Sequence, residues 1–199
     1  MVLYLSIVGV AMVLICSVNI IFLMPILNFS PWFMILAVSL SVVYEFAIDG
    51  IIAFLICRLP EKWFAIDKKC FNVSKREQKF YEKLGIRKWK DKVWELGGLN
   101  GFSKSKIENP NDPKYSERFL IESNKGYVEH VVGIILGFSV IFIFPLKYAL
   151  SVGVPVAIVN LLLNSMSAMI LRYNTPKLHT LHKRAMRNLA IENGKKDAE

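Results

Sequence analysis

The chain has 199 residues, of which 54% are hydrophobic, and its formal net charge is +9. A mean hydropathy of +0.40 is too high for an ordinary soluble domain of this length. Nucleic-acid binding is disfavoured despite the positive charge, because the basic residues lie next to apolar segments and no nucleic-acid motif is present.

The first apolar block begins at the N-terminus, and residues 1–44 contain no Asp, Glu, Lys or Arg. A membrane crossing takes about 20 mostly apolar residues, so we predict two helices, over about 2–24 and 32–57. The break between them contains Pro25, Asn28, Ser30 and Pro31. Turn-forming residues at this point indicate a hairpin. A cleaved signal peptide is disfavoured, because the segment has neither a basic start nor a small-residue cleavage pattern.

A second apolar block covers residues 131–171 and is also long enough for two crossings. We predict helices over about 131–147 and 152–171. The residues that interrupt the block are Pro145, Lys147, Gly153 and Pro155. This block is therefore expected to form a second hairpin.

The basic residues predict the orientation. Of 25 Lys and Arg, 17 lie between Arg58 and Lys125, 7 lie from Arg172 onward, and Lys147 alone lies in a hairpin tip. Because basic residues collect on the cytoplasmic side, both termini and the middle segment are expected to be cytoplasmic. The protein is then a multi-pass protein of the cell membrane. The three cysteines have no paired or metal-ligand spacing and are expected to be reduced thiols.

These patterns predict an all-α integral membrane protein with four transmembrane helices in two hairpins. A cytoplasmic interfacial segment of amphipathic helices and loops joins the hairpins. The predicted divisions are an N-terminal hairpin, 1–57, an aromatic and basic segment, 58–129, a second hairpin, 130–171, and a basic amphipathic tail, 172–199.

The middle segment contains local signals for helices. Ser74 followed by Glu77 is a capping-box pattern, which predicts a helix over about 75–84 that stops at Gly85. Another helix is expected to begin near Lys114 and to run into the third crossing. Downstream of the fourth crossing, Asn174, Thr175 and Pro176 are expected to interrupt the chain before a basic amphipathic helix over about 177–191.

His130 is the strongest candidate for catalysis, because it is the only histidine before the tail and lies where the charged segment meets the third apolar helix. Imidazole titrates near neutral pH and suits a general base. Glu122 and Glu129 lie near the same predicted helical face and could orient the ring. The alternative is a histidine that only anchors the helix at the membrane interface.

Glu45 and Asp49 lie i,i+4 on the second predicted helix. Carboxyl groups at this depth are costly and usually face other helices. They could contact a substrate hydroxyl or form a proton path. Alternatively, they have a purely structural role, in which they pair with Asn160, Asn164 or Ser165 on the fourth helix or are two protonated acids.

No metal site is predicted. His179 and His182 form an i,i+3 pair, but no third ligand is evident, and solvated histidines in a tail are much commoner. No nucleotide-binding or nucleophile-elbow pattern is present either.

The run Phe80–Asp91, with the sequence FYEKLGIRKWKD, resembles the signature of the glycosyl-4,4'-diaponeurosporenoate acyltransferase family. Further pieces of this pattern follow the same order and extend the resemblance to about 58–178. They are Arg58-Leu59-Pro60 with Trp63-Phe64, Gly101-Phe102-Ser103-Lys104, Tyr115 with Arg118-Phe119 and Glu122, and Arg172-Tyr173-Asn174 with Pro176 and Leu178. His130 lies where the family has a histidine.

The resemblance implies transfer of a fatty acyl group from a thioester carrier to a hydroxyl of a lipid or glycolipid. His130 would be the base, assisted by Glu122 or Glu129, and acyl-CoA or an acyl-carrier protein would be the donor, with no bound cofactor. The residues expected to contact substrates are Arg87, Lys88, Trp89, Lys90, Asp91, Lys104, Arg118, Arg172, Asn174, Glu45 and Asp49. The expected partners are membrane lipid, the acceptor and the acyl donor.

Two other functions are compatible with the residues. A non-enzymatic scaffold could hold anionic lipids on the basic segment, where each well-placed Lys or Arg gains about 1 kcal/mol. A small transporter could use Glu45 and Asp49, but the second predicted helix shows no break near them.

Overall fold

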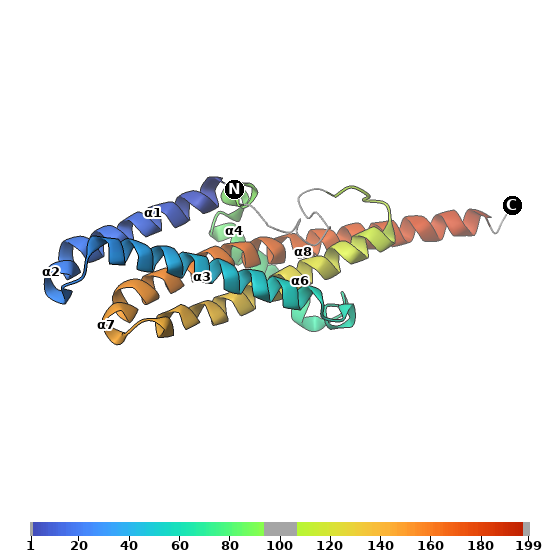
Figure 1. Cartoon of the computed structure of the whole chain (residues 1–199). Coiled ribbons are helices and arrows are strands. Elements are labelled where there is room, and N and C mark those ends of the chain that lie inside the picture. The colour runs from blue at the N-terminus through green and yellow to red at the C-terminus, as the bar shows by residue number, and fades with distance from the viewer. Residues whose placement is uncertain (1, 94–106, 197–199) are drawn as a thin grey trace. The chain divides into compact units, whose positions relative to one another are not determined.

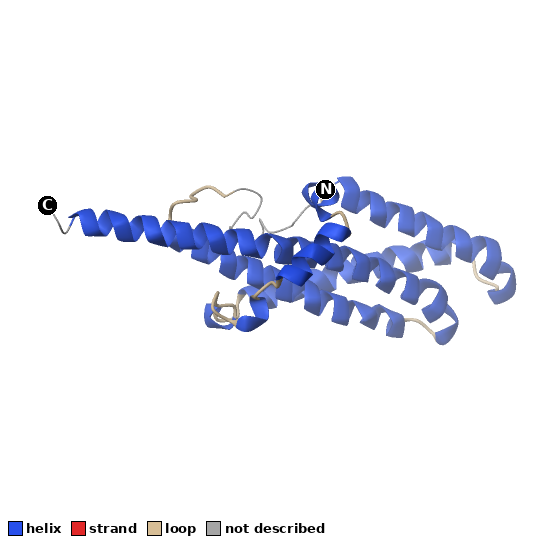
Figure 2. Ribbon diagram, turned by 180° about the vertical axis from the view of Figure 1, so that it is seen from behind, coloured by secondary structure: helices blue, strands red, loops and turns tan. Residues whose placement is uncertain are grey.

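The structure is a computed structural model that describes residues 2–93 and 107–196, and these residues contain helices and connections but no strand (Figure 2). Within these ranges four helical segments are long and apolar enough to cross a membrane: Leu3–Leu27, Pro31–Cys57, Pro113–Ile143 and Leu146–Gly194. The prediction of an all-α protein with four membrane-length helices is therefore confirmed. All three cysteines are free thiols, as expected.

The chain divides into two compact units. The first comprises Met1–Leu55, Lys92–Trp94 and Glu129–Met166, and the second comprises Ile56–Asp91, Glu95–Val128 and Ser167–Glu199. Two long helices, α6 (Pro113–Gly137) and α8 (Val154–Lys196), contribute residues to both units. The predicted start of a helix near Lys114 is confirmed by α6.

The first hairpin begins with α1 (Val2–Val18), which continues through a π-helical turn, η1 (Asn19–Leu23), into the short helix α2 (Met24–Leu27). Pro25 does not end the helical segment, because it lies in the first turn of α2. Backbone N–H groups in the first turn of a helix have no partner within that helix, so proline, which has no N–H, is tolerated there. The turn occurs at Asn28, whose φ of 56° ends α2. The next helix is α3 (Pro31–Cys57).

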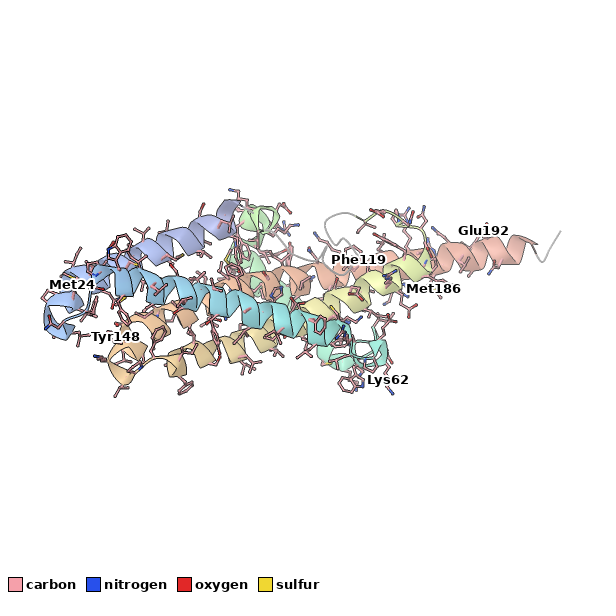
Figure 3. The ribbon with its side chains drawn as sticks, in the orientation of Figure 1. Met24, Lys62, Phe119, Tyr148, Met186 and Glu192 are labelled. Carbon is pink, nitrogen blue, oxygen red and sulfur yellow. The ribbon has the colours of Figure 1, made fainter. Side chains whose placement is uncertain are left out.

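The second hairpin turns after α6 through a 3₁₀ segment, η6 (Phe138–Ile143), and the short helix α7 (Leu146–Tyr148). A π-helical turn, η7 (Ala149–Gly153), then leads into α8. The tips of both hairpins, marked by Met24 and Tyr148, lie at the same end of the first unit (Figures 1 and 3).

Apolar side chains from both hairpins form the core of the first unit. They are Met34, Val38, Val140, Tyr148, Val152, Val156 and Ala157. A polar contact supports this packing, because the buried Asn19 side chain donates to the carbonyl oxygen of Ser151 at 2.9 Å. Phe29 and Phe33 also lie against the ring of Tyr148.

The second unit contains α4 (Lys75–Lys83), α5 (Ile86–Trp89) and the 3₁₀ turns Glu61–Trp63 and Lys69–Phe71. A third 3₁₀ turn, Lys90–Lys92, begins in this unit. The predicted capping box is confirmed, because the Ser74 hydroxyl accepts from the backbone N–H of Glu77 at 3.1 Å. Gly85 follows α4 with a φ of 68°, the left-handed conformation that glycine adopts readily. Phe119, Leu120 and Leu178 pack together in this unit.

The predicted interruption at Asn174–Pro176 is wrong, because α8 continues through Pro176. Proline removes one backbone donor from a helix, the N–H that would bond the carbonyl of Arg172 four residues earlier, but the other backbone hydrogen bonds of a long helix are kept. Thr175 donates to the carbonyl of Leu171 at 2.9 Å, and Thr180 donates to that of Pro176 at 2.9 Å. The basic tail is therefore part of the fourth long helix.

Gly153→Ala tests the close contact between η7 and η6. An added Cβ would lie 2.9 Å from the Cα of Ile141, a backbone atom that cannot rotate away. We expect a loss of about 1–3 kcal/mol in unfolding free energy, measured by thermal unfolding in detergent.

Gly50→Ala is the matched control, because a Cβ at this position of α3 meets nothing within 4 Å. We expect it to be neutral or stabilising by about 0.5–1 kcal/mol. An equal loss of unfolding free energy in Gly153→Ala and Gly50→Ala would contradict the close contact between η7 and η6.

A candidate active site among the membrane helices

Five polar side chains from three helices meet in the first unit. Helical spacing places Glu45 and Asp49 on one side of α3, and Asn160 and Asn164 on one side of α8. His130 belongs to α6. Lipid offers no hydrogen-bond donors or acceptors, so polar groups at this depth must find partners within the protein.

Asn164 connects three of the other members of this cluster, Asn160, Asp49 and His130. Its Nδ2 donates to Oδ1 of Asn160 at 2.7 Å and to Oδ2 of Asp49 at 3.3 Å. Its Oδ1 lies 2.8 Å from Nδ1 of His130. One amide on α8 thus binds side chains from α3 and α6.

These contacts determine the tautomer of His130. The amide nitrogen of Asn164 points at Asp49 and Asn160, so its oxygen is the atom that faces the imidazole. That oxygen can only accept, and Nδ1 of His130 therefore donates. In the neutral ring the basic lone pair then lies on Nε2, the arrangement that a general base requires.

Two glycines of α6 let the helices approach closely at the cluster. A Cβ at Gly133 would lie 2.8 Å from Oδ1 of Asp49, and one at Gly137 would lie 2.9 Å from Oε2 of Glu45. Asn160 also donates to the carbonyl of Gly133 at 3.2 Å. Small residues at this position therefore bring polar side chains of α3 and α8 against the α6 backbone.

Glu45 differs from the other members. The residue is 7% exposed, and neither carboxyl oxygen accepts a hydrogen bond from the part of the chain that the structure describes. It lines a cavity of about 40 Å³ with residues of α1, α3 and α8. Asp49 and Asn160 also line this cavity, so it adjoins the hydrogen bonds of Asn164.

The two acids predicted to assist His130 lie in different units. Glu122 is buried in the second unit and accepts from Lys125 at 2.8 Å. Glu129 precedes His130 in the first unit, and neighbouring residues on a helix do not face each other. The side chain placed against Nδ1 of His130 is Asn164. The assisting roles of Glu122 and Glu129 stay predictions.

Arg172, a predicted substrate contact, holds the second unit together. It is 9% exposed and makes two 2.8 Å hydrogen bonds to the Glu77 carboxylate. It also donates to the carbonyls of Cys70 and Asn72 at 3.1 and 3.0 Å, and its guanidinium lies over the ring of Tyr127. With most of its donors occupied, Arg172 joins α8 to α4 and to the turn before α4.

Several other residues expected to contact substrates lie in or next to α5. Arg87 donates to the hydroxyl of Tyr173 at 3.0 Å and pairs with Glu82, whereas Lys90 pairs with Asp91 at 3.2 Å. The indole of Trp89 donates to the carbonyl of Leu84 at 3.1 Å. Lys88 and Arg118 are exposed, Asn174 is partly buried, and Lys104 lies outside the described residues. The hydrogen bonds of Arg87 and Trp89 attach α5 to Tyr173 and to the end of α4.

His182, considered above for metal binding, contacts the hydroxyl of Ser116 through Nδ1 at 2.9 Å.

The sequence predicted only a structural role for Asn160 and Asn164. Their i,i+4 spacing on an apolar helix is the signal that could have marked them as part of the site, since amide groups are rare in such helices.

The fold and the site together define a multi-pass, all-helical membrane protein with a histidine-containing polar cluster among its helices. Over residues 60–184, more than half of its length, the chain matches the family described as glycosyl-4,4'-diaponeurosporenoate acyltransferase. The chain belongs to this family of acyltransferases, and the resemblance seen in its motifs is confirmed. No curated protein and no solved structure matches the chain.

Glu77 provides a pH test of the Arg172 interaction. Burial raises the pKa of its carboxyl group. Hydrogen bonds from Arg172 and Tyr81, together with the positive charge of Arg172, lower the pKa by more than burial raises it, so the pKa lies below the ordinary 4.5. The ionised carboxylate therefore stabilises the folded state above pH 4.5, and this contribution is lost as the pH falls through the lowered pKa.

We expect Glu77→Gln to lower the melting temperature at neutral pH, by a difference that shrinks as the pH falls below 4.5. Thermal unfolding of both proteins across this range measures the effect. Glu61→Gln, the same change at an exposed position, should shift stability by less than about 0.5 kcal/mol. A constant difference between Glu77→Gln and the unsubstituted protein would exclude the carboxylate as its source.

Proposed function

We propose that the protein transfers a fatty acyl group from a thioester carrier to a hydroxyl of a lipid or glycolipid, with His130 as general base. Membership of an acyltransferase family supports the reaction class. The observation that carries the assignment of the base is the 2.8 Å contact between Nδ1 of His130 and Oδ1 of Asn164.

The chemistry proceeds in two proton transfers. Nε2 of His130 removes the proton of the acceptor hydroxyl as its oxygen attacks the thioester carbonyl. When the tetrahedral intermediate collapses, the carbon–sulfur bond breaks and the imidazolium returns the proton to the departing thiolate. The products are an ester and the free thiol of the carrier. Asn164 keeps Nδ1 protonated throughout, and Asp49 in turn orients Asn164.

The donor in this proposal is acyl-CoA or an acyl-carrier protein, both of which carry phosphate. Arg87, Lys88, Lys90 and Lys104 supply positive charge for these phosphates, and guanidinium groups bind phosphate with paired hydrogen bonds. Trp89 and Asp91 support this segment, through the Leu84 carbonyl and through Lys90. Arg118 adds an exposed cation on α6.

Asn174 and Arg172 stay predicted substrate contacts in this proposal. Asn174 is partly buried, and Arg172 holds that part of α8 through its contacts with Glu77. The acceptor belongs to the membrane, which agrees with four apolar helices of membrane length within the described residues. The distribution of basic residues supports a cytoplasmic position for both termini and for the donor-binding residues.

His130→Ala should reduce transfer by about 10²–10⁴-fold, because the hydroxyl loses its base. Asn164→Ala should reduce it by about 10–100-fold, because the ring loses the group that orients it. The assay follows radiolabelled palmitoyl-CoA into extractable lipid, with purified protein reconstituted in membrane lipid.

His182→Ala is the matched control, since this histidine contacts Ser116 in the second unit. It should retain transfer within a few-fold, and melting temperatures measured on the same samples show which variants are folded. Near-normal turnover in folded His130→Ala would contradict the proposed base.

The orientation is tested with single cysteines at Asn28 and Lys147, both exposed near the hairpin tips, and at Lys88 in the second unit. The variants are made after Cys16, Cys57 and Cys70 have been replaced. In intact cells a membrane-impermeant maleimide should label positions 28 and 147 and spare position 88, because the basic segments lie inside. Labelling of position 88 before the cells are opened would reverse the proposed topology.

A further inference from the structure

We propose that the cavity beside Glu45 binds the hydroxyl end of a neutral lipid alcohol, with the alcohol donating its hydrogen bond to the Glu45 carboxyl group. This inference rests on the proposed function and deepens it, because it describes the acceptor as an apolar chain that ends in a hydroxyl. The cavity lies within the first unit.

Glu45 calls for a ligand that donates. A buried acceptor without a hydrogen bond costs about 1–3 kcal/mol, and more when it is charged. Both oxygens of Glu45 are in this situation within the described residues. Nearby polar groups do not relieve it: Asp49 and the Oδ1 of Asn160 accept from Asn164, and the hydroxyl of Tyr4, which also lines the cavity, makes no hydrogen bond to Glu45. A donor from a bound molecule would satisfy Glu45.

The other residues that line the cavity indicate the chemistry of the rest of the ligand. Apolar side chains dominate the lining, among them Val8, Ala11 and Met12 of α1 and Val159 and Leu163 of α8. A volume of about 40 Å³ admits a few water-sized groups, such as a terminal hydroxymethyl. The apolar walls therefore suit the first carbons of an alkyl chain, and the chain would continue into lipid.

The chemistry of the walls favours an alcohol over an ion. A metal cation takes several oxygen ligands, typically six or more for calcium, whereas Asp49 and Asn160 already bond to Asn164. An ammonium group would have to lose its hydration among apolar side chains. A hydroxyl is neutral and satisfies Glu45 at the lowest desolvation cost.

The position of the cavity links the ligand to the reaction. Asp49 and Asn160 line it, and both bond to the same Asn164 that contacts His130. An alcohol held by Glu45 therefore lies beside the hydrogen-bond network of the proposed base. Glu45 is a binding residue in this proposal, and His130 remains the base.

A photoreactive probe tests the site on the full-length protein in lipid nanodiscs. The probe is a dodecanol with a diazirine near its hydroxyl end, and the control is its methyl ether, which has the same chain but no donor. Mass spectrometry of the cross-linked peptides reports labelling of the cavity walls of α1 and α8. We expect the alcohol to label these walls about tenfold more than the ether.

Substitutions at Glu45 separate its role from general partition into lipid. Glu45→Gln keeps an acceptor and should keep the preference for the alcohol, whereas Glu45→Leu should abolish it. Ala11→Phe fills the cavity from α1 with Glu45 intact and should remove labelling by both probes. Equal labelling by alcohol and ether in the unsubstituted protein would overturn the proposal, even if the variants fail to fold. An alcohol preference that persists in folded Glu45→Leu would also overturn it.

The transfer assay distinguishes this proposal from the proposed function. Acyl transfer without any alcohol preference at the cavity would refute the binding site and leave the acyltransferase assignment intact. An alcohol preference at the cavity in a protein that transfers no acyl group would support the binding site and refute the assignment.

Discussion

The structure of the membrane helices depends on the side chain of Asn164. Its amide contacts Asp49 on α3, His130 on α6 and Asn160 on its own helix, at 3.3, 2.8 and 2.7 Å. Within lipid these groups have no alternative partners, so separating the helices would leave several of them unsatisfied. The same bonds that hold three helices together also determine which nitrogen of His130 is basic. Structural and catalytic requirements therefore coincide at this amide.

The glycines of α6 make that arrangement possible. Gly133 and Gly137 provide no side chain where the carboxyl groups of Asp49 and Glu45 approach, so α3 and α8 can place polar groups directly against α6. Close approach through small residues is a general means of packing membrane helices. Here it also concentrates polar groups beside a cavity that α1, α3 and α8 line.

Arg172 has the corresponding role in the second unit. It bonds to Glu77 at the start of α4 and to the backbone of residues 70 and 72, so a segment rich in aromatic and basic residues is attached to α8. The family match covers both this segment and His130. Arg172 and Tyr173, which are part of the family motif, therefore organise the donor-binding segment in the proposed mechanism, through Glu77 and Arg87 respectively.

The sequence by itself determined the helix content, the four membrane-length segments, the cap at Ser74 and the family. These features depend on apolar length, on capping residues a few positions apart, or on a contiguous motif, all of which are local. Only the tertiary structure decided that Asn164 faces His130, that Arg172 pairs with Glu77 and that Glu45 lines a cavity. Asn164 and His130 are 34 residues apart on different helices, and their contact depends on the rotation and register of packed helices, which hydropathy does not specify. The continuity of α8 through Pro176 was likewise seen only in the structure, because the local signal of Pro176 predicted an interruption whereas a long helix keeps its other backbone hydrogen bonds on both sides of one missing donor.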